Sequence, residues 1–244
     1  MNVLCVIPAR YASTRLPGKP LKDIAGKPMI CRVYERAAKA SRVAPAIVAT
    51  DDSRIYDAVL QHGGKAVMTR KDHPTGTDRL AEVAEKYPDV DLIINVQGDE
   101  PLIEPKLIDE LAAAFDGDAD LQMATVCTEI TDEAEQQNPN NVKVVMDKQG
   151  YALYFSRSLM PYPCHPGTPV YQHIGIYAYK RDFLLAYAKM AETPLEHAES
   201  LEQLRALENG YRIKVIKTPY RFVGVDTAED LAKVNAIYRQ MMQG

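Results

Sequence analysis

The first 115 residues of the chain alternate short apolar runs with amphipathic segments. Three apolar runs, rich in β-branched side chains, lie at residues 3–7, 46–49 and 92–96. Segments in which apolar residues recur at helical spacing lie at residues 30–37, 55–59, 80–87 and 107–115. Such runs favour strands buried on both faces, with Pro8 ending the first. Strands that alternate with helices predict βαβ units and a parallel sheet.

The pattern changes beyond residue 120. Three further strands are predicted without regular helices between them, at residues 123–126, 142–145 and 174–177. Residues 161–169 contain four prolines and are predicted to form a loop or a dimer arm. Two helices are predicted near the end of the chain, at residues 196–208 and 227–242. This half therefore favours a mixed sheet or a small second lobe.

Charge is unevenly distributed along the chain. The formal net charge is −4, which argues against broad nucleic-acid binding. Residues 1–27 nevertheless carry a local charge of +4, because only Asp23 opposes their basic side chains. Those side chains are Arg10, Arg15, Lys19, Lys22 and Lys27. This asymmetry suits a small anionic ligand at one place.

No stretch of the sequence approaches the roughly 20 apolar residues that cross a bilayer. Arg10 follows only a short apolar run, so the N-terminus lacks the plan of a signal peptide. The expected location is therefore the cytoplasm, with no membrane partner.

Ligands of parallel sheets bind beyond the carboxyl ends of the strands. The segments that follow the three apolar runs begin at Arg10, Thr50 and Gln97. The first lacks both G-x-G-x-x-G and G-x-x-x-x-G-K-[ST], which counts against dehydrogenases and P-loop NTPases. Its hydroxyl, guanidinium and ammonium groups could neutralise a triphosphate. The same composition also suits a solvated turn.

Asp99 follows a predicted strand and Asp226 precedes a predicted helix, and each has more than one interpretation. Asp99 could be a turn former before Pro101, and Asp226 could favour the dipole of a helix that Thr227 and Asp230 cap. Alternatively, the two carboxylates could hold Mg²⁺, which takes hard oxygen ligands from one or two acids and from substrate phosphates.

Residues 10–21, RYASTRLPGKPL, closely resemble the signature loop of the 3-deoxy-manno-octulosonate (Kdo) cytidylyltransferases, a family of sugar nucleotidyltransferases. Further similar stretches follow in the same order, and together they cover nearly the whole chain. They are IVATDD (47–52), MTR (68–70), TGTDRL (75–80), NVQGDEP (95–101), YFSR (154–157), HIGIY (173–177), LEQLR (201–205) and GVDT (224–227).

The resemblance implies an α/β fold: a Rossmann-like, mostly parallel sheet of the nucleotide-diphospho-sugar transferase type, with a smaller mixed-sheet lobe for sugar binding and dimerisation. It implies one cytidylyltransferase domain over residues 1–244. Within it, residues 1–120 would bind nucleotide, 121–220 would bind sugar and dimerise, and 221–244 would supply a metal aspartate and the closing helix. The family joins CTP to Kdo with Mg²⁺, giving CMP-Kdo and pyrophosphate for lipopolysaccharide or capsule synthesis.

The resemblance also implies the site residues. Arg10, Ser13 and Lys19 match the triphosphate grip, with Arg15 as a further candidate, and Asp99 and Asp226 match the metal carboxylates. The segment expected near cytosine holds Arg70, His73 and Asp78. Gln97 is implied in both CTP and sugar contacts. The Kdo pocket is implied to contain Arg157, His173 and Tyr177. Glu199, Glu202 and Gln203 would share one helix face and are implied to accept hydrogen bonds from sugar hydroxyls.

Some features leave alternatives open. Residues 161–172 are short beside family forms with a longer arm and resemble the capsule-associated form, and Thr75 stands where serine is common. The chain could instead serve another acidic sugar, such as sialic acid or amino-Kdo. A nucleotide sensor without turnover is a second alternative, and an NAD oxidoreductase, which lacks its glycine fingerprint here, is a third. A homodimer is expected from the resemblance alone.

Overall fold

The computed structural model describes residues 1–12, 16–165, 167–220 and 222–243 and contains two compact units. The first unit comprises Met1–Asp109 and Phe222–Gly244, and the second comprises Glu110–Arg221. The end of the chain therefore returns to the unit that its beginning builds. Ser13 and Arg15, both predicted nucleotide ligands, lie outside the described residues.

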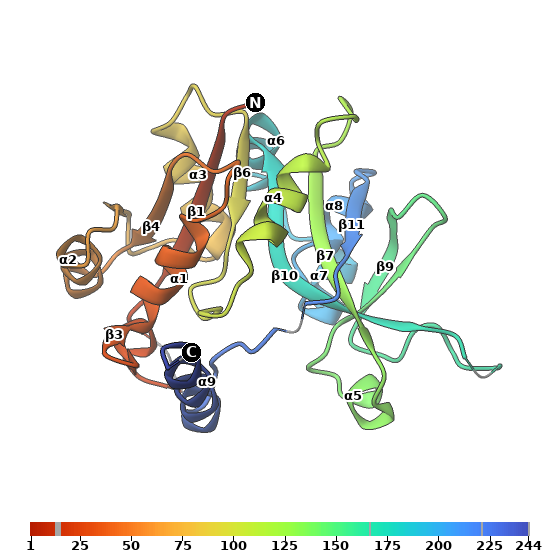
Figure 1. Ribbon diagram of the computed structural model, residues 1–244. Helices are drawn as coiled ribbons and strands as arrows, with labels where there is room; N and C mark the ends of the chain where they lie inside the picture. The colour runs from red at the N-terminus through yellow and green to blue at the C-terminus, as the bar shows by residue number, and fades with distance from the viewer. Residues whose placement is uncertain (13–15, 166, 221, 244) are drawn as a thin grey trace. The chain divides into compact units, whose positions relative to one another are not determined.

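The first unit contains a parallel sheet in the order β6-β1-β4-β5 (Figure 1). Its strands are β1 (Val3–Ala9), β4 (Ala46–Thr50), β5 (Ala66–Met68) and β6 (Leu92–Asn95). The three predicted strands are confirmed, although the prediction that Pro8 ends the first is wrong. Pairing with β6 stops at Val6, so the missing N–H of Pro8 leaves no gap on that side of the ladder.

Helices predicted from apolar spacing are confirmed. They are α1 (Met29–Ala37), α2 (Ser53–Gln61), α3 (Gly76–Glu85) and α4 (Pro105–Ala113). Between β1 and α1 the chain forms a short 3₁₀ turn, η1 (Lys19–Leu21), and a small hairpin of β2 (Asp23–Ile24) and β3 (Lys27–Pro28).

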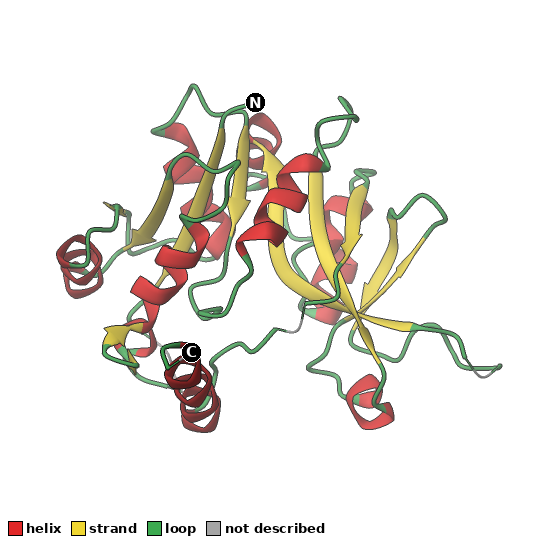
Figure 2. Ribbon diagram, viewed as in Figure 1, coloured by secondary structure: helices red, strands yellow, loops and turns green. Residues whose placement is uncertain are grey.

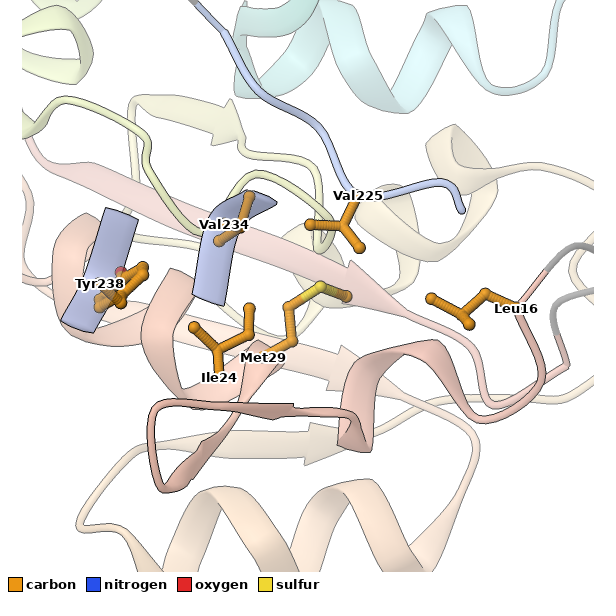
Figure 3. Close-up of a cluster of buried hydrophobic side chains, with 6 residues drawn as sticks. All are labelled: Leu16, Ile24, Met29, Val225, Val234 and Tyr238. Carbon is orange, nitrogen blue, oxygen red and sulfur yellow. The ribbon is translucent and has the colours of Figure 1, made fainter. Parts of the chain in front are cut away.

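The closing helix α9 (Ala228–Met241) packs on the first unit through a cluster of buried side chains (Figure 3). The cluster joins Leu16, Ile24, Met29, Val225, Val234 and Tyr238. The helix predicted at residues 227–242 is confirmed, and it buries Val234 and Tyr238 while Met241 is exposed. Burying Val234 and Tyr238 contributes roughly 1.5–3 kcal/mol each, which anchors the segment that carries Asp226.

The second unit contains a mixed sheet in which β7 lies between β10 and β11 (labelled in Figure 1; strands are yellow in Figure 2). Its strands are β7 (Met123–Ile130), β8 (Lys143–Met146), β9 (Ala152–Ser156), β10 (Val170–Lys180) and β11 (Ile213–Lys217). The pairs β7–β10, β8–β9 and β8–β10 are antiparallel, and β7–β11 is parallel. The predicted α/β class, with a parallel sheet and a mixed-sheet lobe, is confirmed.

Two predictions for the second unit are wrong. No helix was expected between β7 and β8, but a short one, α5 (Glu133–Gln137), lies there. The side chain of Asp132 caps its N-terminus by accepting from the amide of Glu135. The single helix predicted for residues 196–208 is two helices, α7 (Pro194–Glu199) and α8 (Leu204–Glu208). Ser200 ends α7 with a left-handed backbone, φ 51°. Glu199, Glu202 and Gln203 therefore do not share a helix face.

The remaining helix of the second unit is α6 (Arg181–Tyr187), directly after β10. In the predicted arm, the described residues between 161 and 169 have no helix or strand, as the prolines require. Within the described parts of the chain, no helix has the length and apolar character needed to cross a membrane.

Candidate active site

A pocket of about 350 Å³ opens at the carboxyl ends of β1 and β6 in the first unit. Its lining residues are Pro8, Ala9, Arg10, Ala12, Lys19, Pro20, Gln97, Gly98, Asp99 and Asp226. Five predicted site residues, Arg10, Lys19, Gln97, Asp99 and Asp226, are thus brought together from three distant parts of the chain.

Lys19 lies between the two aspartates. Its Nζ donates to Asp99 Oδ2 at 2.7 Å and to Asp226 Oδ1 at 3.0 Å. Burial alone would lower the pKa of Lys19, but the two carboxylates outweigh it and raise that pKa. The lysine is therefore charged at neutral pH, and its two contacts show that both acids converge on one point.

Close backbone contacts hold the two acids in place. A Cβ on Gly98 would lie 2.8 Å from the carbonyl oxygen of Pro8, so only glycine lets this turn approach β1 so closely. The amide of Val225 donates to the carbonyl of Asp99 at 2.9 Å, which places Asp226 beside Asp99. Val225 is itself buried in the cluster of Figure 3. The arrangement is thus set by packing as well as by charge.

Glu100 adds a third acid beside this pair. Its Oε2 is buried and has no hydrogen-bond partner among the described residues. Burial, and then the charges of Asp99 and Asp226, raises the pKa of Glu100 to about 8. A protonated Glu100 adds no charge at neutral pH, so Asp99, Asp226 and Lys19 together carry one net negative charge.

Arg10 is held by the segment before α3. Its guanidinium donates to the carbonyls of His73, at 2.6 Å, and Thr75, at 3.2 Å. His73 is buried, and its Nε2 donates to Glu82 Oε2 at 2.5 Å. Although burial opposes it, hydrogen bonds from Lys86, the Arg70 amide and His73 lower the pKa of Glu82 to about 2. Neutral carbonyls position Arg10 without cancelling its charge.

The other residues expected near cytosine are Asp78 and Arg70, and both side chains have acidic or hydroxyl partners within the protein. Asp78 Oδ2 accepts from the amide and hydroxyl of Thr75, completing the capping box of α3. Arg70 is exposed, with its Nε 3.5 Å from Asp72 Oδ1. Neither lines the pocket described above, and their contact with a base stays a prediction.

The turn after β4 serves structure. Asp52 caps α2 through the amide of Arg54 at 3.0 Å. Asp51 Oδ2 lies 3.3 Å from Nη2 of Arg79, which is fully buried and also donates to the hydroxyl of Thr69. The sequence analysis gave Arg79 no role, because a basic residue on a helix normally faces solvent.

Two predicted sugar ligands are joined in the second unit. Glu199 accepts from the hydroxyl of Ser156 at 2.6 Å and from the amide of Arg157 at 3.0 Å. The Arg157 guanidinium donates to the carbonyls of Glu199, at 2.7 Å, Pro139 and Ser200. Because its described partners are neutral carbonyls, Arg157 keeps its charge available for an anion.

Lys143 contacts the backbone of Arg157, and the sequence analysis did not predict this role. It is fully buried and donates from Nζ to the carbonyls of Asn138, at 3.0 Å, and Arg157, at 2.6 Å. Burial lowers its pKa, while the nearby charge of Glu199 opposes the change. A lysine at the start of a strand gives no sequence signal for such a position.

His173 and Tyr177 lie on β10 within a row of rings. The His173 ring is 4.9 Å from Phe155, edge to face, and 5.4 Å from Tyr177. Burial lowers the pKa of His173 to about 3 and raises that of Tyr177. Both side chains are therefore neutral at neutral pH, so Arg157 is the cation of the predicted sugar set.

The turn between α7 and α8 carries Glu202 and Gln203. A buried ion pair, Arg205 Nε to Glu196 Oε2 at 2.8 Å, ties the two helices together. The hydroxyl of Tyr187 donates to the carbonyl of Glu202 at 2.6 Å. Gln203 is buried, and its Nε2 has no hydrogen-bond partner among the described residues. A buried amide donor without a partner costs free energy, and a bound ligand that accepts its hydrogen bond would remove this cost.

Comparison with known proteins identifies the chain's relatives. The cytidylyltransferase family matches residues 4–215. A 3-deoxy-manno-octulosonate cytidylyltransferase of Fusobacterium nucleatum is 57% identical over 235 residues, or 96% of each chain. One from Geobacter metallireducens is 53% identical, again over 96% of each chain.

Solved structures agree. That of a CMP:2-keto-3-deoxy-manno-octonic acid synthetase complexed with CTP is 48% identical, with a TM-score of 0.95 over 99% of this chain and all of that one. A 4-diphosphocytidyl-2C-methyl-D-erythritol synthase of Anaerococcus prevotii, 14% identical with a TM-score of 0.65, shares the fold. With this much of its length matched, and as its motifs predict, the chain is a cytidylyltransferase that belongs to the 3-deoxy-manno-octulosonate cytidylyltransferase family.

Proposed function

We propose that this chain transfers the cytidylyl group of CTP to Kdo and releases pyrophosphate, with the nucleotide bound in the pocket of the first unit. The observation that carries the proposal is the position of Lys19, whose ammonium bridges Asp99 and Asp226 at the rim of a pocket that Arg10 also lines. The two substrates are supported by the names of similar proteins: a 3-deoxy-manno-octulosonate cytidylyltransferase and a CMP:2-keto-3-deoxy-manno-octonic acid synthetase complexed with CTP.

Arg10 and Lys19 would bind the triphosphate. Bonds between cationic donors and phosphate oxygens are among the strong ones, and Arg10 has donors beyond its two carbonyl contacts. Lys19 is a compact charge on a flexible stem, so it can follow the departing pyrophosphate. Ser13 and Arg15, which lie between Arg10 and Lys19 in the sequence, remain predicted ligands.

Asp99 and Asp226 would hold Mg²⁺. One oxygen of each carboxylate contacts the same cation, Lys19 Nζ. Carboxylate oxygens are the hard ligands that Mg²⁺ prefers. No group of three or more His, Cys, Asp or Glu that could hold a metal is found among the described residues, so phosphate oxygens and water would complete the shell. When bound, the ion would acidify the attacking hydroxyl and neutralise charge on the phosphate.

The sugar would be held in the second unit. Arg157 would balance the carboxylate of Kdo, because its described partners are uncharged carbonyls. His173 and Gln203 would supply neutral polar groups from buried positions, and Tyr177 would supply a hydroxyl from a half-buried one. Glu199 and Glu202 would supply acceptors for sugar hydroxyls. Gln97 is a predicted contact to both substrates.

In the proposed reaction the anomeric hydroxyl of Kdo attacks the α-phosphorus of CTP in line, and pyrophosphate leaves. Positioning and charge stabilisation supply most of the catalysis of such transfers. Arg10 and Lys19 would stabilise charge on the leaving group, and no dedicated side-chain base is required.

The experiment that tests this function measures pyrophosphate release and CMP-sugar formation from CTP and a panel of sugar acids: Kdo, amino-Kdo and sialic acid. Kdo is expected to give the highest kcat/KM, with turnover that requires a divalent ion. Preference for another acid would overturn the sugar assignment, and CTP binding without turnover would favour a sensor. Three statements stay predictions: that the protein is cytoplasmic, that it forms a homodimer, and that its product is used for lipopolysaccharide or capsule synthesis.

A further inference from the structure

Thr125 places a hydroxyl inside an otherwise apolar part of β7. It is fully buried, and its Oγ1 lies 2.9 Å from His173 Nε2, 2.8 Å from the carbonyl oxygen of Ile176 and 3.2 Å from that of Ile174. All three partners lie on β10, where the register with β7 shifts between Ile174 and Tyr177. The irregular strand thus turns two carbonyls and one ring nitrogen toward a single hydroxyl.

The number of hydrogens at this point decides the state of the histidine. A hydroxyl has one hydrogen to donate, and carbonyl oxygens only accept. Two oxygens 2.8 Å apart need a hydrogen between them, so Thr125 donates to Ile176. With that hydrogen used, the contact to His173 is a hydrogen bond only if Nε2 carries the proton.

The rings beside His173 keep it in this orientation. Phe155 meets it at an interplanar angle of 75°, and Tyr177 lies on β10 with its ring 5.4 Å away. Burial lowers the pKa of His173 to about 3, so the ring is neutral near pH 7. A neutral ring with its proton on Nε2 has a lone pair on Nδ1, and Nδ1 has no described hydrogen-bond partner.

We infer that Thr125 is a positioning residue that holds His173 as the Nε2–H tautomer, so that Nδ1 accepts a hydrogen bond from a hydroxyl of the sugar acid. The sugar's part in this inference rests on the proposed function; the tautomer does not. A lone pair at Nδ1 repels a carboxylate, so His173 would discriminate in favour of a hydroxyl, while Arg157 would bind the acid group.

The first test is the tautomer itself, in the full chain without ligand. A two-bond ¹H–¹⁵N correlation spectrum distinguishes Nε2–H from Nδ1–H imidazoles, and His173→Gln assigns the signal among the five histidines. The inference expects Nε2–H at neutral pH. Observation of Nδ1–H or of a charged ring in the wild-type protein would overturn it, whatever the protein catalyses.

The second test removes the hydroxyl. Thr125→Val keeps the shape, but it leaves Nε2–H buried without a partner, so the spectrum is expected to shift toward Nδ1–H. The KM for Kdo is expected to rise several-fold, up to about tenfold, the worth of roughly one hydrogen bond. The KM for CTP is expected to stay within about twofold, and Thr125→Ser is expected to restore both the spectrum and the KM.

These outcomes separate the inference from the proposed function. If the protein fails to use Kdo but shows the Nε2–H signal, the function is wrong and the positioning by Thr125 stands. If Kdo is the substrate and Thr125→Val, folded by circular dichroism, leaves the tautomer and the KM for Kdo unchanged, the inference is wrong. Should Thr125→Val not fold, the wild-type spectrum still decides the inference, because an Nδ1–H or charged His173 would overturn it.

Discussion

The two units build their candidate sites from different kinds of groups. In the first, Lys19, Asp99 and Asp226 are charged, and 17%, 32% and 47% of their side chains are exposed. In the second, His173 and Gln203 are neutral and more than nine-tenths buried. Partial contact with water lets charges be carried at modest cost, whereas buried groups must be neutral or paired.

This difference suits the two proposed ligands. A triphosphate with a metal ion is recognised by charge, which tolerates movement as pyrophosphate leaves. A sugar differs from its analogues by single hydroxyls, and a buried group left unpaired by the wrong sugar penalises it strongly. The molecule therefore places the charges that would bind the triphosphate in one unit, and buried neutral donors and acceptors, together with the cation Arg157, in the other.

The largest expected effect comes from removing charge in the first unit. Asp99→Asn or Asp226→Asn keeps the shape but weakens metal binding, so kcat should fall by about a thousandfold, or about 4 kcal/mol of transition-state stabilisation. Pyrophosphate release measures the loss, and circular dichroism checks folding. Asp57→Asn, at an exposed position of α2, is the matched control. Near-normal turnover in either site variant would show that charge there is not catalytic.

Arg205 and Glu196 form a buried charge pair in the second unit, and we expect this pair to act on stability rather than on chemistry. Glu196→Gln removes the nearer counter-ion of the buried Arg205 and leaves Glu202, whose Oε1 lies 3.9 Å from Arg205 Nη1, so the change should cost about 3 kcal/mol in the free energy of unfolding. Urea denaturation measures this cost.

The matched control on the same segment is Glu192→Gln, which removes the charge from the exposed contact to His197 and should cost less than about 1 kcal/mol. If kcat of the folded Glu196→Gln variant fell as far as that of Asp99→Asn, the contrast between the two units would fail.

The third prediction uses the pH dependence of stability. Burial gives His173 a pKa of about 3 in the folded state, below its unfolded value near 6.5. Between these pH values the unfolded chain binds more protons than the folded chain. The contribution of His173 to the free energy of unfolding is therefore fully present above about pH 6.5 and is lost as the pH falls toward about 3.

Relative to His173→Gln, the wild type should lose about 2 kcal/mol of stability between about pH 7.5 and about pH 5. Urea denaturation of both proteins at the two pH values checks this, because the carboxylates titrate in both and cancel. Parallel losses would mean that His173 is not a buried neutral ring.

The sequence predicts the two units unequally, and the reason is physical. The strands and helices of the first unit follow local apolar periods, and its ligands follow strand ends, so Arg10, Asp99 and the sheet could be located in advance. In the second unit a left-handed Ser200 divides a continuous helical pattern, and local propensity does not reveal such a break. The helix face expected for Glu199, Glu202 and Gln203 was lost for that reason.

Residues that act through long-range contacts were beyond the sequence argument. Thr125 reads as an ordinary strand residue until a register shift in β10 brings His173 to its hydroxyl. Lys143 and Arg79 read as surface cations, yet both are fully buried. Their partners lie on other elements, and the alternation of residue types along one segment carries no information about those partners.

The smallest expected effect concerns how Asp226 is held. Thr227 and Asp230 form the capping box of α9, and Asp230 Oδ2 also accepts from the amide of Asp226 at 3.2 Å. Thr227→Ala should cost about 1 kcal/mol of stability. Since Val225 remains bonded to Asp99 and buried, kcat should change by less than about threefold, an amount below that of a lost hydrogen bond.

Thermal unfolding and turnover measured on the same sample decide this prediction, with Thr227→Ser as the conservative control that keeps the cap. A loss of stability with nearly unchanged kcat means that packing of Val225, not the cap, places the carboxylate. A loss of kcat comparable to that of Asp226→Asn would mean that the cap fixes the acid. The charged site would then depend on hydrogen-bonded positioning as strictly as His173 depends on Thr125.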